Sequence, residues 1–161
     1  MPYKPTADEL LKALDAVYYE IKQLVDMITP TTGHPALDNA VVESRLLHVR
    51  NLLDFFAYDA RRNDDVLAAH YAFPLNPVTI DRTYESRLNK DLAHLTYSRT
   101  LRTQATKPWP VRMVVAPVLE RCSEFIAHIL ATRSVFADVG PTDWRALELH
   151  IRRGLDSLRG P

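Results

Sequence analysis

The chain has 161 residues and a formal net charge of zero, because 20 basic side chains balance 20 acidic ones. This balance argues against a protein that coats polyanions, although it leaves room for a small phosphate site. Apolar residues make up 47% and charged residues 25%, which predicts a single soluble domain over residues 1–161. The one cysteine, the absence of a bilayer-length apolar run and the lack of a signal-peptide pattern predict a cytoplasmic protein with no membrane contact.

The first half of the chain has the apolar spacing of helices. A first helix is expected over about 6–28, where Thr6 and Glu9 form a capping box. The second is expected from Pro35, a residue suited to a first helical turn, to about residue 61. A short helix over 66–70 precedes a proline-containing loop.

The second half predicts three further helices. One is expected over about 81–101, and another over 110–132 with a kink or short break near Val114, caused by Pro117. The last is expected over about 142–158, with Thr142 as N-cap and Gly154 weakening its final turns. No strand alternation occurs. The sequence predicts an all-α, up-and-down bundle of four long helices plus a short accessory or C-terminal helix.

Arg87 and His94 are the most informative polar pair. They lie seven positions apart in R-L-N-K-D-L-A-H, so on a helix they project from one face, offset by about 20°. Asp91 and Ser98 share that face. A permanent guanidinium beside a titratable imidazole can bind a phosphate and transfer a proton.

The second predicted helix carries a polar stripe of its own. Glu43, Arg50 and Asp54 are spaced seven and four apart and therefore share a face, and His48 and Asn51 form a neighbouring stripe. If the second and third long helices pack together, these side chains come close to the Arg87 and His94 face.

Two interpretations of this constellation remain open. In the structural one, Arg87 pairs with Glu43 or Asp54, His94 bonds to a carbonyl, and the group fixes helix register. In the catalytic one, His94 exchanges a proton with an RNA 2′-hydroxyl or the leaving oxygen, and Arg87 stabilises the developing phosphorane charge. Asn89 then orients the phosphate or caps a local deviation in the helix, and Glu43 positions Arg87 or tunes His94. This chemistry needs no metal and no cofactor.

The segment from Arg87 to His94 resembles the Arg-x(4–6)-His motif of the HEPN superfamily, with six intervening residues. The wider phrases L-N-K-D-L-A-H-L-T-Y-S-R and E-S-R-L-L-H-V-R-N-L-L-D-F-F are similar to HEPN-like and abortive-infection proteins. The resemblance implies an all-α homodimer that acts as a metal-independent endoribonuclease or toxin-type effector on RNA, with an antitoxin or other protein as partner. Arg87 and His94 match the motif positions, and Glu43 is a candidate match for an acidic residue on an earlier helix.

The chain also departs from that pattern. Active members usually have a polar residue after the motif arginine, whereas this chain has Leu88 there and Asn89 one place later. Tyr97 follows His94 by three positions, not by the two found in tyrosine-modified HEPN toxins. Some members only bind or dimerise. The alternative is therefore a non-catalytic helical module for dimerisation or partner binding, in which the same residues form a structural polar cluster.

Other candidate sites are weaker. The six histidines form neither H-x3-H nor H-E-x-x-H, so no metal site is predicted from spacing. Cys122, between Leu119 and Phe125, is expected to fill the core. Trp109 and Trp144 lie beside prolines at helix starts, where packing is a more common role than base stacking.

Overall fold

The computed structural model of the chain describes residues 3–29, 32–60, 62–90, 92, 103, 108–132 and 141–160. These residues form five α-helices and one 3₁₀ turn and contain no β-strand, which confirms the all-α fold class. The elements are α1 (Ala7–Asp26), α2 (Pro35–Phe55), η1 (Ala68–Tyr71), α3 (Arg82–Lys90), α5 (Val111–Ala131) and α6 (Pro141–Arg159). None of these helices is long and apolar enough to cross a membrane.

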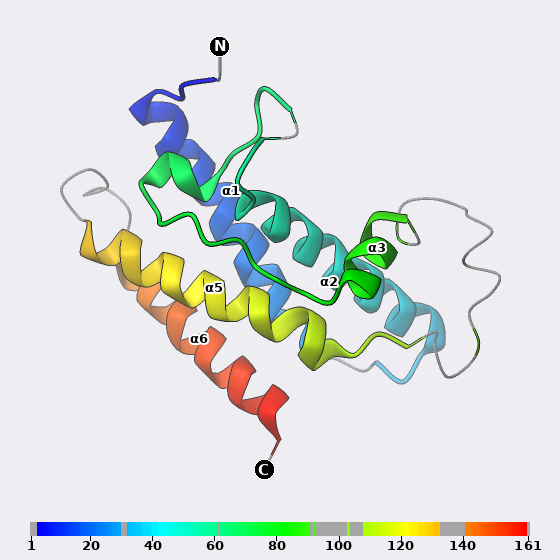
Figure 1. The fold of residues 1–161 in the computed structure, drawn as a ribbon. Coiled ribbons are helices and arrows are strands. Elements are labelled where there is room, and N and C mark those ends of the chain that lie inside the picture. The colour runs from blue at the N-terminus through cyan, green and yellow to red at the C-terminus, as the bar shows by residue number, and fades with distance from the viewer. Residues whose placement is uncertain are drawn as a thin grey trace.

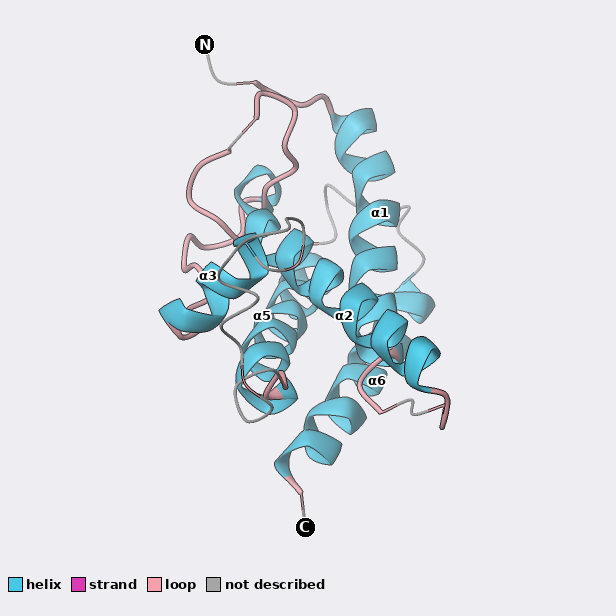
Figure 2. Cartoon of the chain, turned by 90° about the vertical axis from the view of Figure 1, so that its right-hand side faces the viewer, coloured by secondary structure: helices cyan, strands magenta, loops and turns pink. Residues whose placement is uncertain are grey.

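Two helix pairs build the body of the protein. α1 packs against α2 and α5 packs against α6, while α1 also contacts both α5 and α6 (Figure 1). The short helix α3 lies beside α2 and away from α6 in both views (Figures 1 and 2). The four long helices therefore share a core, and α3 sits at the edge of it.

The start of α1 is fixed by the predicted capping box. The Thr6 amide donates to Glu9 Oε2 at 2.8 Å, and the Glu9 amide donates to Thr6 Oγ1 at 3.3 Å. The Tyr3 hydroxyl donates to the same carboxylate at 2.6 Å. These hydrogen bonds favour the ionised carboxylate, and together they lower the pKa of Glu9 to about 2, with Tyr3 as the largest cause.

α2 ends at Phe55, six residues before the predicted end at residue 61. Phe55 and Phe56 are both buried, and both rings contact Phe125, with centroid distances of 5.1 and 6.2 Å. Adjacent positions on a helix point about 100° apart. Leaving the helix after Phe55 lets both rings enter the same core, and this aromatic packing overrides the local helical pattern.

The third predicted helix is observed only over its first part. α3 ends at Lys90, and Leu92 lies in a turn. Asp91, His94 and Ser98 lie outside the described residues, as does most of the remaining predicted range to 101. The two motif residues that the structure describes, Arg87 and Asn89, occupy the last turn of α3.

The two C-terminal helices differ from prediction in detail. Of the expected kink or short break, the break is absent, because α5 is continuous through Pro117. Pro117 frees the carbonyl of Met113, and because Met113 is 55% exposed, water can satisfy that group. α6 begins at Pro141, so Thr142 lies inside the helix and is not its N-cap.

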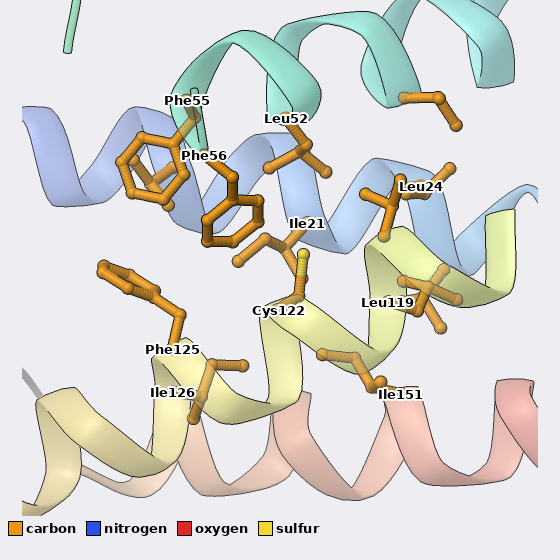
Figure 3. Close-up of a cluster of buried hydrophobic side chains, with 14 of the residues drawn as sticks. Ile21, Leu24, Leu52, Phe55, Phe56, Leu119, Cys122, Phe125, Ile126 and Ile151 are labelled. Atoms are coloured by element: carbon orange, nitrogen blue, oxygen red, sulfur yellow. The ribbon is translucent and has the colours of Figure 1, made fainter. Parts of the chain in front are cut away.

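The core is a continuous apolar layer between the two helix pairs. Figure 3 shows Ile21 and Leu24 of α1 facing Cys122 and Leu119 of α5, with Ile151 contributed by α6. Cys122 is fully buried, as predicted, and its burial raises the pKa of the thiol well above its ordinary value. A protonated, inaccessible thiol is unreactive, which leaves Cys122 a packing role.

Gly154 allows α6 to approach α1 closely. A Cβ at this position would lie 2.5 Å from Ile28 Cδ1 and 3.0 Å from Val25 Cγ2. The glycine that weakens helix propensity in the sequence is thus the residue that lets two helices pack tightly.

Candidate functional site

Arg87, the arginine of the predicted catalytic pair, is buried. Its side chain leaves the last turn of α3 and stacks on Trp109, with Cζ 3.9 Å from the ring centroid. Nη1 donates to the carbonyl of Pro108 at 3.5 Å, and the Tyr84 ring lies 6.0 Å away. Only 5% of Arg87 is exposed. The guanidinium therefore joins α3 to the segment that precedes α5.

Arg87 is one of three buried arginines in the described part of the chain. Arg45 on α2 donates from Nε to the carbonyl of Met27, the C-cap of α1, at 2.6 Å. Arg121 on α5 stacks on Phe73 with Cζ 4.1 Å from the ring centroid and donates to the carbonyl of Pro74. Each guanidinium joins a helix to a backbone carbonyl where the chain changes direction, which is a structural use of the charge.

A cleft of about 190 Å³ lies on a different side of α3, between α3, α2 and the segment that precedes α3. Its polar lining comes from both helices and the turn after α2: Arg50, Asp54, Tyr58, Glu85 and Asn89. Its apolar lining consists of Leu53, Ala57, Pro77, Val78, Ile80 and Leu88. Arg50 and Asp54 of α2 and Asn89 of α3 line this cleft, whereas Arg87, which the spacing placed opposite the α2 stripe, does not line it.

The charged groups that line this cleft differ in solvent exposure and in whether they have a polar partner. Arg50 is half-buried, and its side chain forms no hydrogen bond or ion pair with any described residue. Glu85 is exposed, and its carboxylate likewise has no polar contact within the described residues. Asp54 has interactions of its own. An arginine held partly out of water without an acceptor is suited to bind an anionic group.

His48 and Asn51 face α1 instead of α3. The Glu20 carboxylate accepts from His48 Nδ1 at 2.7 Å and from Asn51 Nδ2 at 3.1 Å. Because the carboxylate only accepts, Nδ1 carries the proton, and Nε2 is left to face the Ser44 hydroxyl at 3.5 Å. This polar cluster joins α1 to α2 within the protein body.

The order Glu20, His48, Ser44 resembles a catalytic triad in connectivity but lacks its surroundings. Ser44 lies in the middle of α2, where neighbouring backbone amides are used by the helix. The described part of the chain therefore shows no set of free donors that could stabilise an oxyanion beside Ser44. His48 is only 6% exposed, so the cluster is assigned to helix packing.

Glu43 stands apart from both clusters. It is exposed on α2, does not line the cleft, and forms no hydrogen bond or ion pair with any described residue, Arg87 included. Glu43 is therefore not seen to position Arg87.

Sequence reasoning missed the role of three residues, Glu85, Glu20 and Trp109. Glu85 lies four positions before Asn89, and this i, i+4 spacing was a detectable signal that both share a face. The sequence contains weaker indications of the roles of Glu20 and Trp109, because Glu20 contacts His48 and Asn51 and Trp109 contacts Arg87, all of which are distant in sequence. Trp109 was expected to pack, but nothing in its neighbourhood indicated Arg87 as the partner.

The described residues include no group of three histidine, cysteine or carboxylate side chains arranged to hold a metal. Comparison with protein families, with curated proteins and with solved structures finds no match for this chain.

Proposed function

We propose that this protein is a non-catalytic helical binding module, in which Arg87 has a structural role and the α2–α3 cleft receives the ligand. The observation that carries the proposal is the burial of Arg87 against Trp109 and Pro108. A phosphate-binding guanidinium must present its N–H edges to solvent. Arg87 would have to leave the indole ring and the carbonyl before it could do so.

The energetics support a structural role. A desolvated cation on an indole face contributes on the order of 2 kcal/mol, and that contact is lost whenever the arginine turns outward. The positive charge also lies in the last turn of α3, where the helix dipole favours it. The scaffold of the module is the up-and-down bundle of four long helices that the sequence predicts. The HEPN resemblance implies a second copy of the chain or another protein as partner.

A second candidate is the HEPN-like, metal-independent endoribonuclease or toxin-type effector. One observation favours it: Asn89 of the motif segment lines the same cleft as Arg50 and Asp54 of α2. In this candidate His94 is the general acid and base, and RNA enters near Asn89.

Cleavage of RNA separates the two candidates. Purified wild-type protein and His94→Ala are incubated with structured and unstructured RNAs in the presence of a chelator, and the products are resolved on a gel. The binding-module proposal expects intact RNA in both reactions. Cleavage by the wild type that disappears in His94→Ala would replace it with the ribonuclease.

The structural role of Arg87 is tested separately by unfolding in urea. Arg87→Ala is expected to lower the free energy of unfolding by about 2–3 kcal/mol, because it removes the cation from Trp109 and leaves the site unfilled. The matched control is Arg82→Ala on the same helix, where the arginine is exposed. Equal stability of the two variants would contradict the structural assignment.

A further inference from the structure

The α2–α3 cleft contains two opposite charges that do not neutralise each other. Arg50 and Glu85 both line it, and neither forms an ion pair with the other or with any other described residue. In water an exposed pair gains little from direct contact, so two such groups can remain apart. A ligand that carries both signs would satisfy both groups at once.

The size of the cleft limits the ligand. The cleft has a volume of about 190 Å³. Sites for drug-sized molecules are larger, at about 300–1,000 Å³. The cleft therefore accepts a small molecule or a single side chain, and its apolar lining by Leu53, Val78 and Leu88 favours an apolar group.

We propose that this cleft binds a free α-amino acid with an apolar side chain. The carboxylate contacts Arg50, the ammonium group contacts Glu85, and the side chain lies against Leu53, Val78 and Leu88. Asn89, which offers both a donor and an acceptor, completes the polar rim. This assignment rests on the proposed binding function and names the ligand class for its cleft.

Charge balance favours this ligand over a nucleotide. The guanidinium of Arg50 and the carboxylate of Glu85 line the cleft without polar contacts to described residues, whereas Asp54 has interactions of its own. A phosphate monoester would place up to two negative charges beside the Glu85 carboxylate, whereas a zwitterion adds no net charge. Burial of the apolar side chain then adds favourable free energy.

Binding is measured by titration calorimetry and by thermal shift on the full chain. The probes are L-leucine, L-isoleucine, L-methionine and L-phenylalanine. Leucine methyl ester removes the carboxylate, N-acetyl-leucine removes the ammonium charge, and uridine monophosphate and inorganic phosphate test an anion site. We expect saturable binding of at least one amino acid, and at least about a tenfold lower affinity for the methyl ester and the N-acetyl derivative of that amino acid.

Variants locate the site. Arg50→Gln and Glu85→Gln are each expected to weaken amino-acid binding by at least about tenfold. Their matched controls are Arg82→Gln on α3 and Glu43→Gln on α2, which alter exposed charges outside the cleft and should bind as the wild type does.

Two results would overturn the assignment: no heat or thermal shift with any amino acid, or unchanged affinity in both cleft variants. Binding of uridine monophosphate or phosphate that depends on Arg50 would replace it with a nucleotide or anion site. These failures are distinct from failure of the binding-module proposal, which is decided by RNA cleavage and by the stability of Arg87→Ala.

Discussion

Arg87 and Arg121 lie in separate regions of the fold and have the same kind of surroundings. Arg87 stacks on Trp109 and donates to Pro108, whereas Arg121 stacks on Phe73 and donates to Pro74. In both places the aromatic residue and the proline are neighbours in sequence. Arg87 lies in a motif-like segment and Arg121 does not. Burial of an arginine on an adjacent aromatic residue and proline is thus a structural device in this protein, both inside and outside the motif-like segment.

The two regions differ in what surrounds the charge. Arg121 also pairs with Glu124 on its own helix, and the Phe73 ring beneath it contacts Phe125 at a centroid distance of 5.4 Å. Trp109 is only half-buried, so the Arg87 region is closer to the surface. We therefore expect the Arg121 region to contribute more to stability.

The largest expected effect comes from removing Arg121. Arg121→Ala should lower the free energy of unfolding by about 3 kcal/mol, since it removes the stacked cation and leaves the Pro74 carbonyl without its donor. Urea unfolding measures the change, with exposed Arg112→Ala on the same helix as control. A loss smaller than that of Arg87→Ala would reverse the predicted order of the two regions.

Lysine substitutions separate the effect of charge from that of the planar guanidinium at Arg87 and Arg121, because lysine keeps the charge and lacks the planar group. Arg87→Lys and Arg121→Lys should each cost about 1–2 kcal/mol, since an ammonium stacks less well and cannot reach the same carbonyl geometry. Thermal unfolding measures both, and each 1 kcal/mol corresponds to about 2–4 °C at this chain length. Wild-type stability in either lysine variant would show that a positive charge is enough to stabilise that region and that the planar guanidinium is not needed.

Acidification should affect the Arg121 region first. The turn η1 precedes Phe73, and its His70 Nδ1 accepts from the Leu67 amide at 3.3 Å, which requires neutral imidazole. Burial lowers the pKa of His70 from 6.5. The unfolded chain then takes up the proton more readily, so this contribution is complete above pH 6.5 and declines as the pH falls below it. His70→Gln should flatten stability against pH over that range, and an unchanged profile would remove His70 as the cause.

The smallest effect is expected at Arg50. Because Arg50 is half-buried and its side chain has no polar contact within the described residues, Arg50→Gln should change the free energy of unfolding by less than about 0.5 kcal/mol. Urea unfolding checks this value beside the two buried arginines. A loss comparable to that of Arg87→Ala would place Arg50 among the structural arginines and weaken its assignment as a ligand contact.

Local signals predicted the helices well and their side-chain partners less well. The Thr6–Glu9 capping box is confirmed, since all of its contacts lie within one turn. That Arg50 and Asp54 share one face of α2, the face that lines the cleft, was also predictable, because i, i+4 spacing places two side chains on the same side of a helix. The direction of Arg87 was not, because its partner Trp109 is 22 positions away in the sequence.

The helical fold, the starts of most helices and the burial of Cys122 in the core follow from local sequence, because capping and apolar periodicity act over a few residues. The tertiary structure alone decided that α2 stops at Phe55, that His48 faces Glu20, and that Arg87 turns toward Trp109 while Arg50 lines the cleft. Each of these outcomes depends on which distant segment of the chain packs beside the side chain. Such tertiary packing minimises the free energy of the whole domain and not that of any one helix.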